Sequence, residues 1–377
     1  MIIPFNRAAA ASREAEYVRA ALASGRISGD GPFGRKAEQL LESLTGAPRA
    51  LCTTSCTHAL EMSALLLGIE PGDEVIIPAF TFVSTVNAFA LRGAKPIFCD
   101  VRADTFNLDE KLVAERITDR TRAIVPVHYA GVGCEMDALG SLVRDRPIAI
   151  VEDNAHGLFG TYRGKPLGSF GAMATQSFHE TKNISCGEGG ALLVNDIAYL
   201  ERAEILREKG TNRSKFFRGQ VDKYTWVDLG SSWVLSDVLA AILVAQLEEH
   251  ERIQRQRRRI WERYERGLVD WASASGVRLP MVPSECGQSF HMFYLVMPSL
   301  AARTELIEHL GRFDAKAVFH YQPLQRSPMG ERLGGQSADC PVTDRVADRL
   351  VRLPFYADLT ESEQNQVIDA VRSTPFG

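Results

Sequence analysis

The sequence predicts an α/β protein with a large domain built on a mostly parallel sheet and a small α+β domain at its C-terminal end. The chain has 377 residues, which is more than a single hydrophobic core usually supports. Between residues 49 and 194 short apolar runs alternate with helical patterns, as in parallel sheets covered by helices. A long helical stretch follows, and then strands and helices mix. We predict a large domain over residues 1–235, a linking helix over residues 236–268 and a small domain over residues 269–377.

The predicted strands of the large domain are short and apolar. They cover residues 50–53, 74–77, 96–99, 123–127, 148–151, 174–178 and 191–194. Helical patterns lie near residues 14–22, 57–67 and 109–116, with a further helix ending at residue 89. Ligands of such sheets bind beyond the carboxyl ends of the strands. This rule selects residues 54–58, 78–82, 128–129 and 152–156 as candidate ligand contacts.

A glycine-rich segment precedes the first predicted strand. It contains the spacing G-x-G-x-x-G at Gly29, Gly31 and Gly34. A dinucleotide-binding loop needs a buried strand immediately before it, whereas residues 25–28 are not a strand and Pro32 stands inside the motif. We interpret the segment as a surface loop, either simply mobile or able to fold over a ligand.

The predicted linking helix would be ~50 Å long if unbroken. It holds five arginines between residues 252 and 259, together with an apolar stripe at Ile253, Ile260 and Tyr264. The stripe favours an ordinary amphipathic helix with a solvated face over a nucleic-acid-binding helix. Beyond it, the predicted strands and helices of the small domain lie near residues 290–297, 301–311, 317–321 and 361–371.

Composition and charge exclude several classes of protein. The formal net charge of −4 and the pI near 6.1 give no basic field for nucleic acid. No apolar run approaches the ~20 residues that span a bilayer, and the N-terminus lacks a signal-peptide pattern, so we expect a cytoplasmic protein. The seven scattered cysteines contain no C-x-x-C pair and fit reduced thiols. Cys52, Cys56 and His58 lack a second ligand pair, so we expect no metal site.

Lys182 is the residue around which the predicted chemistry gathers. It lies in the sequence Ser-Phe-His-Glu-Thr-Lys-Asn-Ile, residues 177–184, between two predicted buried strands. A lysine beside a core is costly unless it is neutral or used covalently, and pyridoxal phosphate enzymes use one as an imine. A solvated surface lysine is the ordinary alternative.

Pyridoxal phosphate also needs an acid at its ring nitrogen, a site for its phosphate and a contact against its ring. The sequence offers one candidate for each at a strand end. Asp153 could hold the pyridine nitrogen protonated, although a helix cap or structural ion pair is the simpler interpretation. Residues 54–58 turn from a strand into a helix whose N-terminus could bind phosphate, or could be an ordinary cap. Ser177 offers a hydroxyl, Phe82 a ring to stack on the cofactor, and His156 a further contact; core packing is the alternative for the last two.

Three motifs carry a resemblance to a known family. Val-Glu-Asp-Asn-Ala-His at residues 151–156, the Lys182 segment, and Gly-Glu-Gly-Gly at residues 187–190 resemble the DegT/DnrJ/EryC1/StrS family of nucleotide-sugar aminotransferases. The resemblance runs from Pro4 to the Leu-Pro-Phe that ends at Phe355, and it implies an aspartate aminotransferase-like fold, PLP fold type I. Further blocks resemble the dTDP-4-amino-4,6-dideoxygalactose transaminase branch, at residues 25–33, 53–62 and 209–232.

The resemblance also implies roles for individual residues. Lys182 would be the covalent lysine and proton carrier, and Asp153 the partner of the pyridine nitrogen. The remaining cofactor contacts would be Thr57, His58 and Ser177 at the phosphate, Phe82 on one ring face and His156 beside the ring. Candidate contacts of the sugar nucleotide are Ser28, Gly29, Gly31, Tyr224, His320 and Tyr321.

The family is dimeric, with active sites shared between subunits. Residues 212–232 match the segment that reaches across to the partner. Many members have an asparagine near its end that touches the partner's phosphate, whereas this chain has Ser231 and Ser232. Asn154 stands where alanine is usual.

We therefore expect an aminotransferase that moves an amino group from L-glutamate to C4 of a nucleotide-linked keto sugar. The expected acceptor is dTDP-4-keto-6-deoxy-D-glucose, the product dTDP-4-amino-4,6-dideoxyhexose, and the carrier between the half-reactions pyridoxamine phosphate (PMP). One alternative is a PMP-dependent sugar dehydratase of the same family, which carries histidine where this chain has Lys182. The others are a non-catalytic sugar-nucleotide sensor and a nucleic-acid-binding protein. The sequence leaves open thymidine or uridine, C4 or C3, and an axial or equatorial amine.

Overall fold

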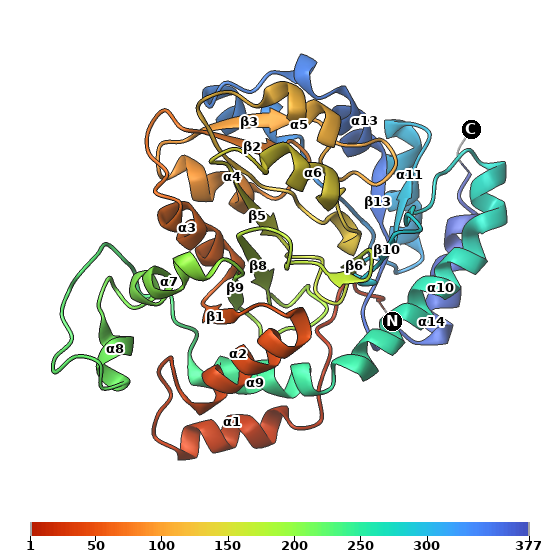
Figure 1. Cartoon of the computed structure of the whole chain (residues 1–377). Helices are drawn as coiled ribbons and strands as arrows, with labels where there is room; N and C mark the ends of the chain where they lie inside the picture. The colour runs from red at the N-terminus through yellow and green to blue at the C-terminus, as the bar shows by residue number, and fades with distance from the viewer. Residues whose placement is uncertain (1, 376–377) are drawn as a thin grey trace.

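The structure is a computed structural model and describes residues 2–375. Within them the central element is a seven-stranded sheet in the order β1-β9-β8-β5-β4-β2-β3 (Figure 1). β9 is antiparallel to both of its neighbours, and the other adjacent pairs are parallel. The strands are β1 (Arg49–Thr53), β2 (Glu74–Pro78), β3 (Lys95–Cys99), β4 (Thr121–Ile124), β5 (Ala149–Asp153), β8 (Met173–Ser177) and β9 (Gly190–Val194). The predicted mostly parallel sheet is confirmed.

Helices cover both faces of this sheet. One face carries α2 (Pro32–Thr45), α9 (Asp237–Glu248), α5 (Glu110–Arg116) and α6 (Met136–Val143), with α1 (Glu14–Ala23) packed against α9. The other face carries α3 (Cys56–Leu66), α4 (Val83–Ala90) and α7 (Leu200–Arg207). In β9, Leu193 packs toward α2 and α9, whereas Leu192 packs toward α3 and α7. Because successive strand side chains point to opposite faces, a strand covered on both sides is apolar throughout.

The glycine-rich segment forms a shorter loop than predicted, because helix α2 begins inside it. Pro32 and Phe33 form the first turn of α2, and Gly31 is its N-cap residue. Proline suits this position because the first N–H groups of a helix lack intrahelical partners. Gly31 allows close contact with α9, since a Cβ there would lie 2.2 Å from the carboxyl carbon of Asp237. The glycine spacing therefore serves packing between α2 and α9.

The predicted long helical stretch over residues 236–268 is helical but not continuous. The stretch forms two helices, α9 and α10 (His250–Ala274), separated at Glu249. The Glu249 carboxylate accepts hydrogen bonds from the backbone N–H and the hydroxyl of Ser12, at 2.7 and 2.5 Å, and from Arg252. These contacts anchor the bend to the start of α1. The division into three units, at residues 1–235, 236–268 and 269–377, stays a prediction.

The arginine-rich part of α10 is not uniformly solvated. Arg257 is buried and donates to the backbone carbonyls of Phe290 and His291, at 2.9 and 2.5 Å. The four other arginines lie on the outer side, each within 4.0 Å of a glutamate carboxylate. One of the five therefore joins α10 to the C-terminal region, and the rest form the expected solvated face.

The C-terminal region has its own antiparallel sheet and core. The sheet has the order β11 (Tyr294–Val296), β13 (Leu350–Arg352) and β12 (Val318–Phe319), so its strands are shorter than predicted. Its helices are α11 (Leu300–Arg312), α12 (Pro328–Arg332), α13 (Pro341–Arg349) and α14 (Glu361–Arg372). Ile3 joins this core and bridges to Ala315. The N-terminal segment therefore packs partly with the C-terminal region.

Two smaller features complete the fold. A second three-stranded sheet consists of β10 (Cys286–Gly287), β6 (Thr161–Tyr162) and β7 (Lys165–Pro166). Figure 1 shows α8 (Arg213–Phe217) and its flanking loops extending away from the body. Over the described part of the chain, no helix combines the length and apolar character needed to cross a membrane.

Candidate active site

A cavity of about 730 Å³ lies at the carboxyl ends of the central strands. The large domain lines it with residues that follow β1, β2, β4, β5 and β8. The C-terminal region closes it with residues of β12 and β13 and with His291. Among the lining residues are Ser55, Thr57, Phe82, Asp153, His156 and Ser177. The strand ends selected from the sequence therefore meet in one place.

Lys182 lies in the turn between β8 and β9 and lines this cavity. Its backbone N–H donates to the carbonyl of His179 at 2.9 Å, which closes the turn. Among residues 2–375 its ammonium group makes no hydrogen bond and no ion pair. Burial in the cavity lowers the pKa of Lys182 to about 8. At neutral pH far more of this lysine is the neutral, nucleophilic amine than for a solvated lysine.

Asp153 ends β5 and is 5% exposed. Its carboxylate accepts a hydrogen bond from the hydroxyl of Thr85 at 2.8 Å and one from the N–H of Ala155 at 3.2 Å. Burial raises the pKa of Asp153, while the Thr85 hydrogen bond opposes that shift. A carboxylate of this kind gains from a cationic partner, such as a protonated ring nitrogen.

A buried pair behind the cavity fixes the end of β5. The Glu152 carboxylate accepts from the N–H groups of Gly168, Phe170 and Gly171, at 2.6 to 2.8 Å, and lies 2.9 Å from His128 Nε2. The His128 Nδ1 atom accepts from the N–H of Cys134 at 3.1 Å, so the ring proton is on Nε2 and is donated to Glu152. Since Glu152 precedes Asp153 on β5, this pair holds the strand end that presents Asp153.

The N-terminus of α3 forms a cluster of hydroxyl and N–H groups at the cavity. Ser55 is the N-cap, and its hydroxyl accepts from the N–H of His58. The hydroxyls of Thr57 and Ser84 lie 2.8 Å apart, and Ser177 faces the same cavity. Hydroxyl donors and free helix N–H groups together suit a phosphate.

The ring of His58 does not belong to this cluster. Its Nδ1 atom lies 2.5 Å from the hydroxyl of Thr54, and the ring packs 6.0 Å from Trp233. The sequence predicts His58 as a phosphate contact, but the cavity lining does not include His58, and its backbone N–H is donated to the Ser55 hydroxyl.

Aromatic side chains also line the cavity. Phe82 is 56% exposed and lies 6.3 Å from the ring of Tyr321. His156 stacks on His291 with ring centres 4.2 Å apart, and its Nε2 atom lies 3.5 Å from the Tyr321 hydroxyl. The Nδ1 atom of His156 is buried without a hydrogen-bond partner among the described residues. Burial lowers the pKa of His156 and of His320, which favours the neutral form of both rings.

The structure separates the predicted sugar contacts into two groups. His320 and Tyr321 line the cavity with Lys182. Ser28, Gly29 and Gly31 line a second cavity of about 570 Å³, next to α7 and α8. Tyr224 is exposed in the extended segment, with its ring 5.8 Å from that of Phe216. A single chain thus does not bring the two groups together.

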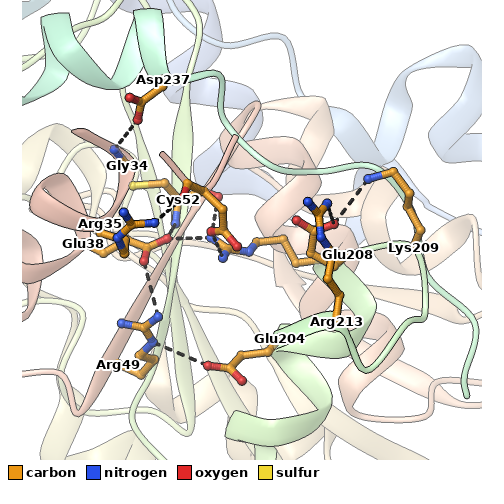
Figure 2. A network of polar contacts seen from close by, with 12 residues as sticks. Gly34, Arg35, Glu38, Arg49, Cys52, Glu204, Glu208, Lys209, Arg213 and Asp237 are labelled. Carbon is orange, nitrogen blue, oxygen red and sulfur yellow. Dashed lines mark hydrogen bonds and ion pairs between the residues drawn. The ribbon is translucent and has the colours of Figure 1, made fainter. Parts of the chain in front are cut away.

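A charge network supports the second cavity (Figure 2). Arg207 is buried and lies 2.5 Å from Glu38 and 2.7 Å from Asp30. Glu38 also accepts from the N–H of Cys52 at 3.0 Å and lies 3.3 Å from Arg49. Burial acts to lower the pKa of Arg207, but the two carboxylates outweigh it and hold the pKa above its ordinary value. The network joins α2, β1 and α7.

Sequence reasoning missed several residues of the cavity. Thr85 is the third residue after Phe82 and bonds to Asp153, but a threonine inside a helical pattern carries no signal of its own. His291 and Arg352 come from the C-terminal region, far along the chain from Lys182. The sequence Arg-Leu-Pro-Phe that begins at Arg352 marks the C-terminal end of the resemblance, yet nothing in it points to a site.

Comparisons with known proteins identify the family. The profile of the DegT/DnrJ/EryC1/StrS aminotransferase family matches residues 9–372. The chain is 32% identical over 349 residues to an uncharacterized protein of Methanocaldococcus jannaschii, covering 91% of this chain and 90% of that protein. It is 30% identical over 383 residues to the spore coat polysaccharide biosynthesis protein SpsC of Bacillus subtilis, covering 100% and 97%.

Solved structures agree over nearly the full length. The aminotransferase TlmJ of Streptoalloteichus hindustanus has 30% identity and a TM-score of 0.91, with 99% of both chains covered. Spr1654 of Streptococcus pneumoniae, described as a sugar aminotransferase and solved in a PMP form, has 28% identity and a TM-score of 0.92, with 99% of this chain and 98% of that one covered. These neighbours confirm the predicted PLP fold type I architecture.

The cavity fits the cofactor of these enzymes. It offers an unpaired lysine, a buried carboxylate, a hydroxyl-rich helix N-terminus and the orphaned Nδ1 atom of His156. Those are the groups that an imine-forming aldehyde, a pyridine nitrogen and a phosphate require. The chain therefore belongs to the DegT/DnrJ/EryC1/StrS aminotransferase family and is a pyridoxal phosphate-dependent enzyme.

Proposed function

We propose that the protein transfers an amino group from L-glutamate to C4 of a nucleotide-linked keto sugar. The proposed acceptor is dTDP-4-keto-6-deoxy-D-glucose, and the product is dTDP-4-amino-4,6-dideoxyhexose. The observation that carries this proposal is the unpaired Lys182, with its lowered pKa, in one cavity with Asp153. The choice of acceptor rests on the branch resemblance of residues 25–33, 53–62 and 209–232.

Cofactor binding is divided among three groups of residues in this proposal. Thr57, Ser177 and the N-terminal N–H groups of α3 hold the phosphate. Phe82 covers one face of the ring, and His156 contacts the ring from its stacked position on His291. Asp153 keeps the pyridine nitrogen protonated, and the Glu152–His128 pair behind it holds the strand end in place.

Lys182 performs the proton transfers. Pyridoxal phosphate, when bound, withdraws electrons from the carbon that carries the transferred nitrogen. The Lys182 amine takes the proton from the α-carbon of the donor, and in the second half-reaction it delivers a proton to the sugar carbon. Its lowered pKa favours both, because the group exchanges protons near neutral pH. The dehydratase alternative is disfavoured since those enzymes carry histidine at this position.

A dimer with shared active sites is part of the proposal. The segment over residues 212–232 extends from the body and exposes large apolar side chains, among them Phe217, Trp226 and Leu229 at 67%, 73% and 57% exposed. Apolar side chains gathered in this way favour contact with another protein surface. A second copy there would bring Ser28, Gly31 and Tyr224 toward the partner's cavity, as the resemblance implies.

An absorbance titration tests the proposed function. The purified protein is followed from ~300 to 500 nm while L-glutamate and then the keto sugar are added. Loss of the cofactor band with glutamate and its return with the sugar are expected. A band that fades and does not return would reject this acceptor. A protein that shows no band even with added pyridoxal phosphate would favour the sugar-nucleotide sensor. Light scattering at micromolar concentration tests the dimer.

A further inference from the structure

Residues 289–291 of the C-terminal region hold His156 at two points. The hydroxyl of Ser289, which is fully buried, donates to the backbone carbonyl of His156 at 2.6 Å. The ring of His291 stacks on the ring of His156, with the ring centres 4.2 Å apart and the planes 17° apart. His156 lines the cavity with Lys182. A segment that begins 133 positions further along the chain therefore fixes the place of a cavity residue.

Asn183 follows Lys182 in the chain and binds both ends of this segment. Its amide nitrogen donates to the backbone carbonyl of Ser289 at 2.6 Å. Its amide oxygen lies 2.8 Å from the Nδ1 atom of His291. Asn183 is only 4% exposed, so these contacts are made inside the protein. One side chain thus connects the turn that carries Lys182 with the segment that holds His156.

These contacts determine which nitrogen of His291 carries the proton. The amide nitrogen of Asn183 must face the Ser289 carbonyl, because two oxygens at that distance would repel each other. The amide oxygen then faces His291 and accepts from its Nδ1–H. Burial lowers the pKa of His291, and His156 and Lys182 add to the shift, which favours the neutral ring. The opposite tautomer would place two lone pairs against each other, so the network selects the Nδ1–H form.

The segment that Asn183 binds is itself held from two sides. On one side, the buried Arg257 of α10 donates to the backbone carbonyls of Phe290 and His291. On the other side, the N–H of Ser289 donates to the carbonyl of Gly131 at 3.0 Å. Gly131 has a φ of +82°, and a Cβ there would lie 1.8 Å from the Ser289 hydroxyl oxygen, so glycine permits this close approach. A segment held in this way can fix the residues that bind to it.

We propose that Asn183 is a positioning residue that fixes the Lys182 amine relative to the His156 ring. This inference rests on the proposed role of Lys182 and concerns how its amine is held. Among residues 2–375 the Lys182 ammonium group has no partner, so its place depends on the backbone turn that Asn183 ties to residues 289–291. A displacement of about 1 Å can slow a reaction about a hundredfold. Because one amine serves both half-reactions, both depend on Asn183.

A double-mutant cycle tests the network. Asn183→Leu removes both hydrogen bonds at similar volume, and His291→Phe keeps a ring that can stack on His156 but has no Nδ1–H. In each variant the limiting rates of both half-reactions should fall about tenfold to a hundredfold. The half-saturating concentrations of L-glutamate and the keto sugar should stay within about threefold of wild type. The double variant should be no slower than Asn183→Leu, because both changes break one network. Losses that multiply, or a loss in one half-reaction only, would overturn the proposal.

Gln364→Met is the matched control for a purely structural role. Gln364 is 2% exposed, and its amide donates to the backbone carbonyl of Ile260 at 2.6 Å, the same distance as from Asn183 to Ser289. It lies outside the lining of the cavity. Urea denaturation should show similar losses of stability in Gln364→Met and Asn183→Leu, whereas only Asn183→Leu should lose rate. Equal losses of rate in the two variants would assign Asn183 a structural role.

Two measurements on the cofactor-free protein do not depend on turnover. Nitrogen NMR of histidine-labelled protein, assigned with His291→Phe, should show the His291 proton on Nδ1 in wild type and a shift toward the Nε2–H form in Asn183→Leu. A wild-type ring protonated on Nε2 would contradict the network.

The second measurement is the rate at which pyridoxal phosphate loads onto Lys182, followed by absorbance. It should fall about tenfold or more in Asn183→Leu and stay unchanged in Gln364→Met. Equal loading rates in wild type and Asn183→Leu would overturn the positioning role. Failure of wild type to accept the keto sugar would instead overturn the proposed function, and both results on the cofactor-free protein would still decide the role of Asn183.

Discussion

The cavity that Lys182 lines and the network around Arg207 differ in whether their enclosed charges have partners within the chain. Arg207 lies between two carboxylates, Glu38 and Asp30, which hold its pKa above the ordinary value. Arg352 and Lys182 face a cavity where no carboxylate of residues 2–375 pairs with them, and burial lowers the pKa of each. The first region is electrostatically complete within the chain. The second offers its two cations to a ligand, which we propose to be the cofactor and a substrate.

Structural and functional charges in this fold can be distinguished by the partners that they have. A buried ion whose partners come from the same chain joins elements, here α2 with α7. A buried ion without a partner lowers stability unless a ligand offsets it, so its retention points to binding. Mutations in the two regions should therefore change different quantities: the free energy of unfolding in one, and reactivity in the other.

Replacing the reactive lysine should have the largest effect. Lys182→Ala is expected to abolish turnover and the absorbance of covalently bound cofactor, because no other lysine in the described part of the chain lines the cavity. The free energy of unfolding should be unchanged or slightly higher, because the Lys182 ammonium group has no partner among residues 2–375 that the substitution would leave unpaired. Steady-state assays and urea denaturation measure the two quantities. Normal turnover in this variant would remove Lys182 from its role.

Breaking the Arg207 pair should affect stability instead. Arg207→Met leaves Glu38 buried without its closest cation, which typically costs about 3–5 kcal/mol. Urea denaturation should show this loss, while the cofactor band of the remaining folded protein persists. The double variant Glu38→Met/Arg207→Met should recover most of the loss, because neither charge is left alone. Arg352→Met is the contrasting variant, and a comparable destabilisation there would break the distinction between the two regions.

Asp153→Asn tests the carboxylate in the cavity. The amide keeps the shape of the side chain and can still accept from Thr85 but cannot stabilise a protonated ring nitrogen. We expect proton abstraction from the donor to slow by about a hundredfold or more, comparable to removing one electrostatic stabiliser from an active site. Stopped-flow absorbance with glutamate measures this step. An unchanged rate would show that Asp153 does not keep the nitrogen protonated.

The lowered pKa of Lys182 predicts a pH dependence of cofactor loading. Imine formation needs the neutral amine, and Lys182 is protonated below its pKa of about 8 and neutral above it. The rate at which pyridoxal phosphate loads onto cofactor-free protein should therefore rise between about pH 7 and 9 and then level off. For a solvated lysine the loading rate would keep rising up to about pH 10.4. Lys182→Ala supplies the background from other lysines. A midpoint above pH 10 would mean that the cavity does not desolvate Lys182.

The strands and the cofactor-binding edge were predictable from the sequence because their signals are local. Each strand of the central sheet is a short apolar run, and the rule that ligands bind at strand ends needs only their direction. This rule selects Thr57, Phe82, Asp153 and His156, and all four line the cavity. The sequence analysis did not predict the first turn of α2, because Pro32 and the glycines near it are typical of loops. Proline is nevertheless common at the first position of a helix.

The fold class, the family and the lysine–aspartate pair that lines the cavity follow from the sequence alone. These depend on residue periodicity and on motifs that are continuous in the chain. The helix break at Glu249 and the burial of Arg257 depend on the tertiary structure. So do the separation of Ser28 and Gly31 from Lys182 and, within residues 2–375, the lack of a hydrogen-bond partner at Arg352 Nε. Whether a charge is paired depends on residues more than a hundred positions away, because carboxylate and guanidinium interact through space and not along the chain.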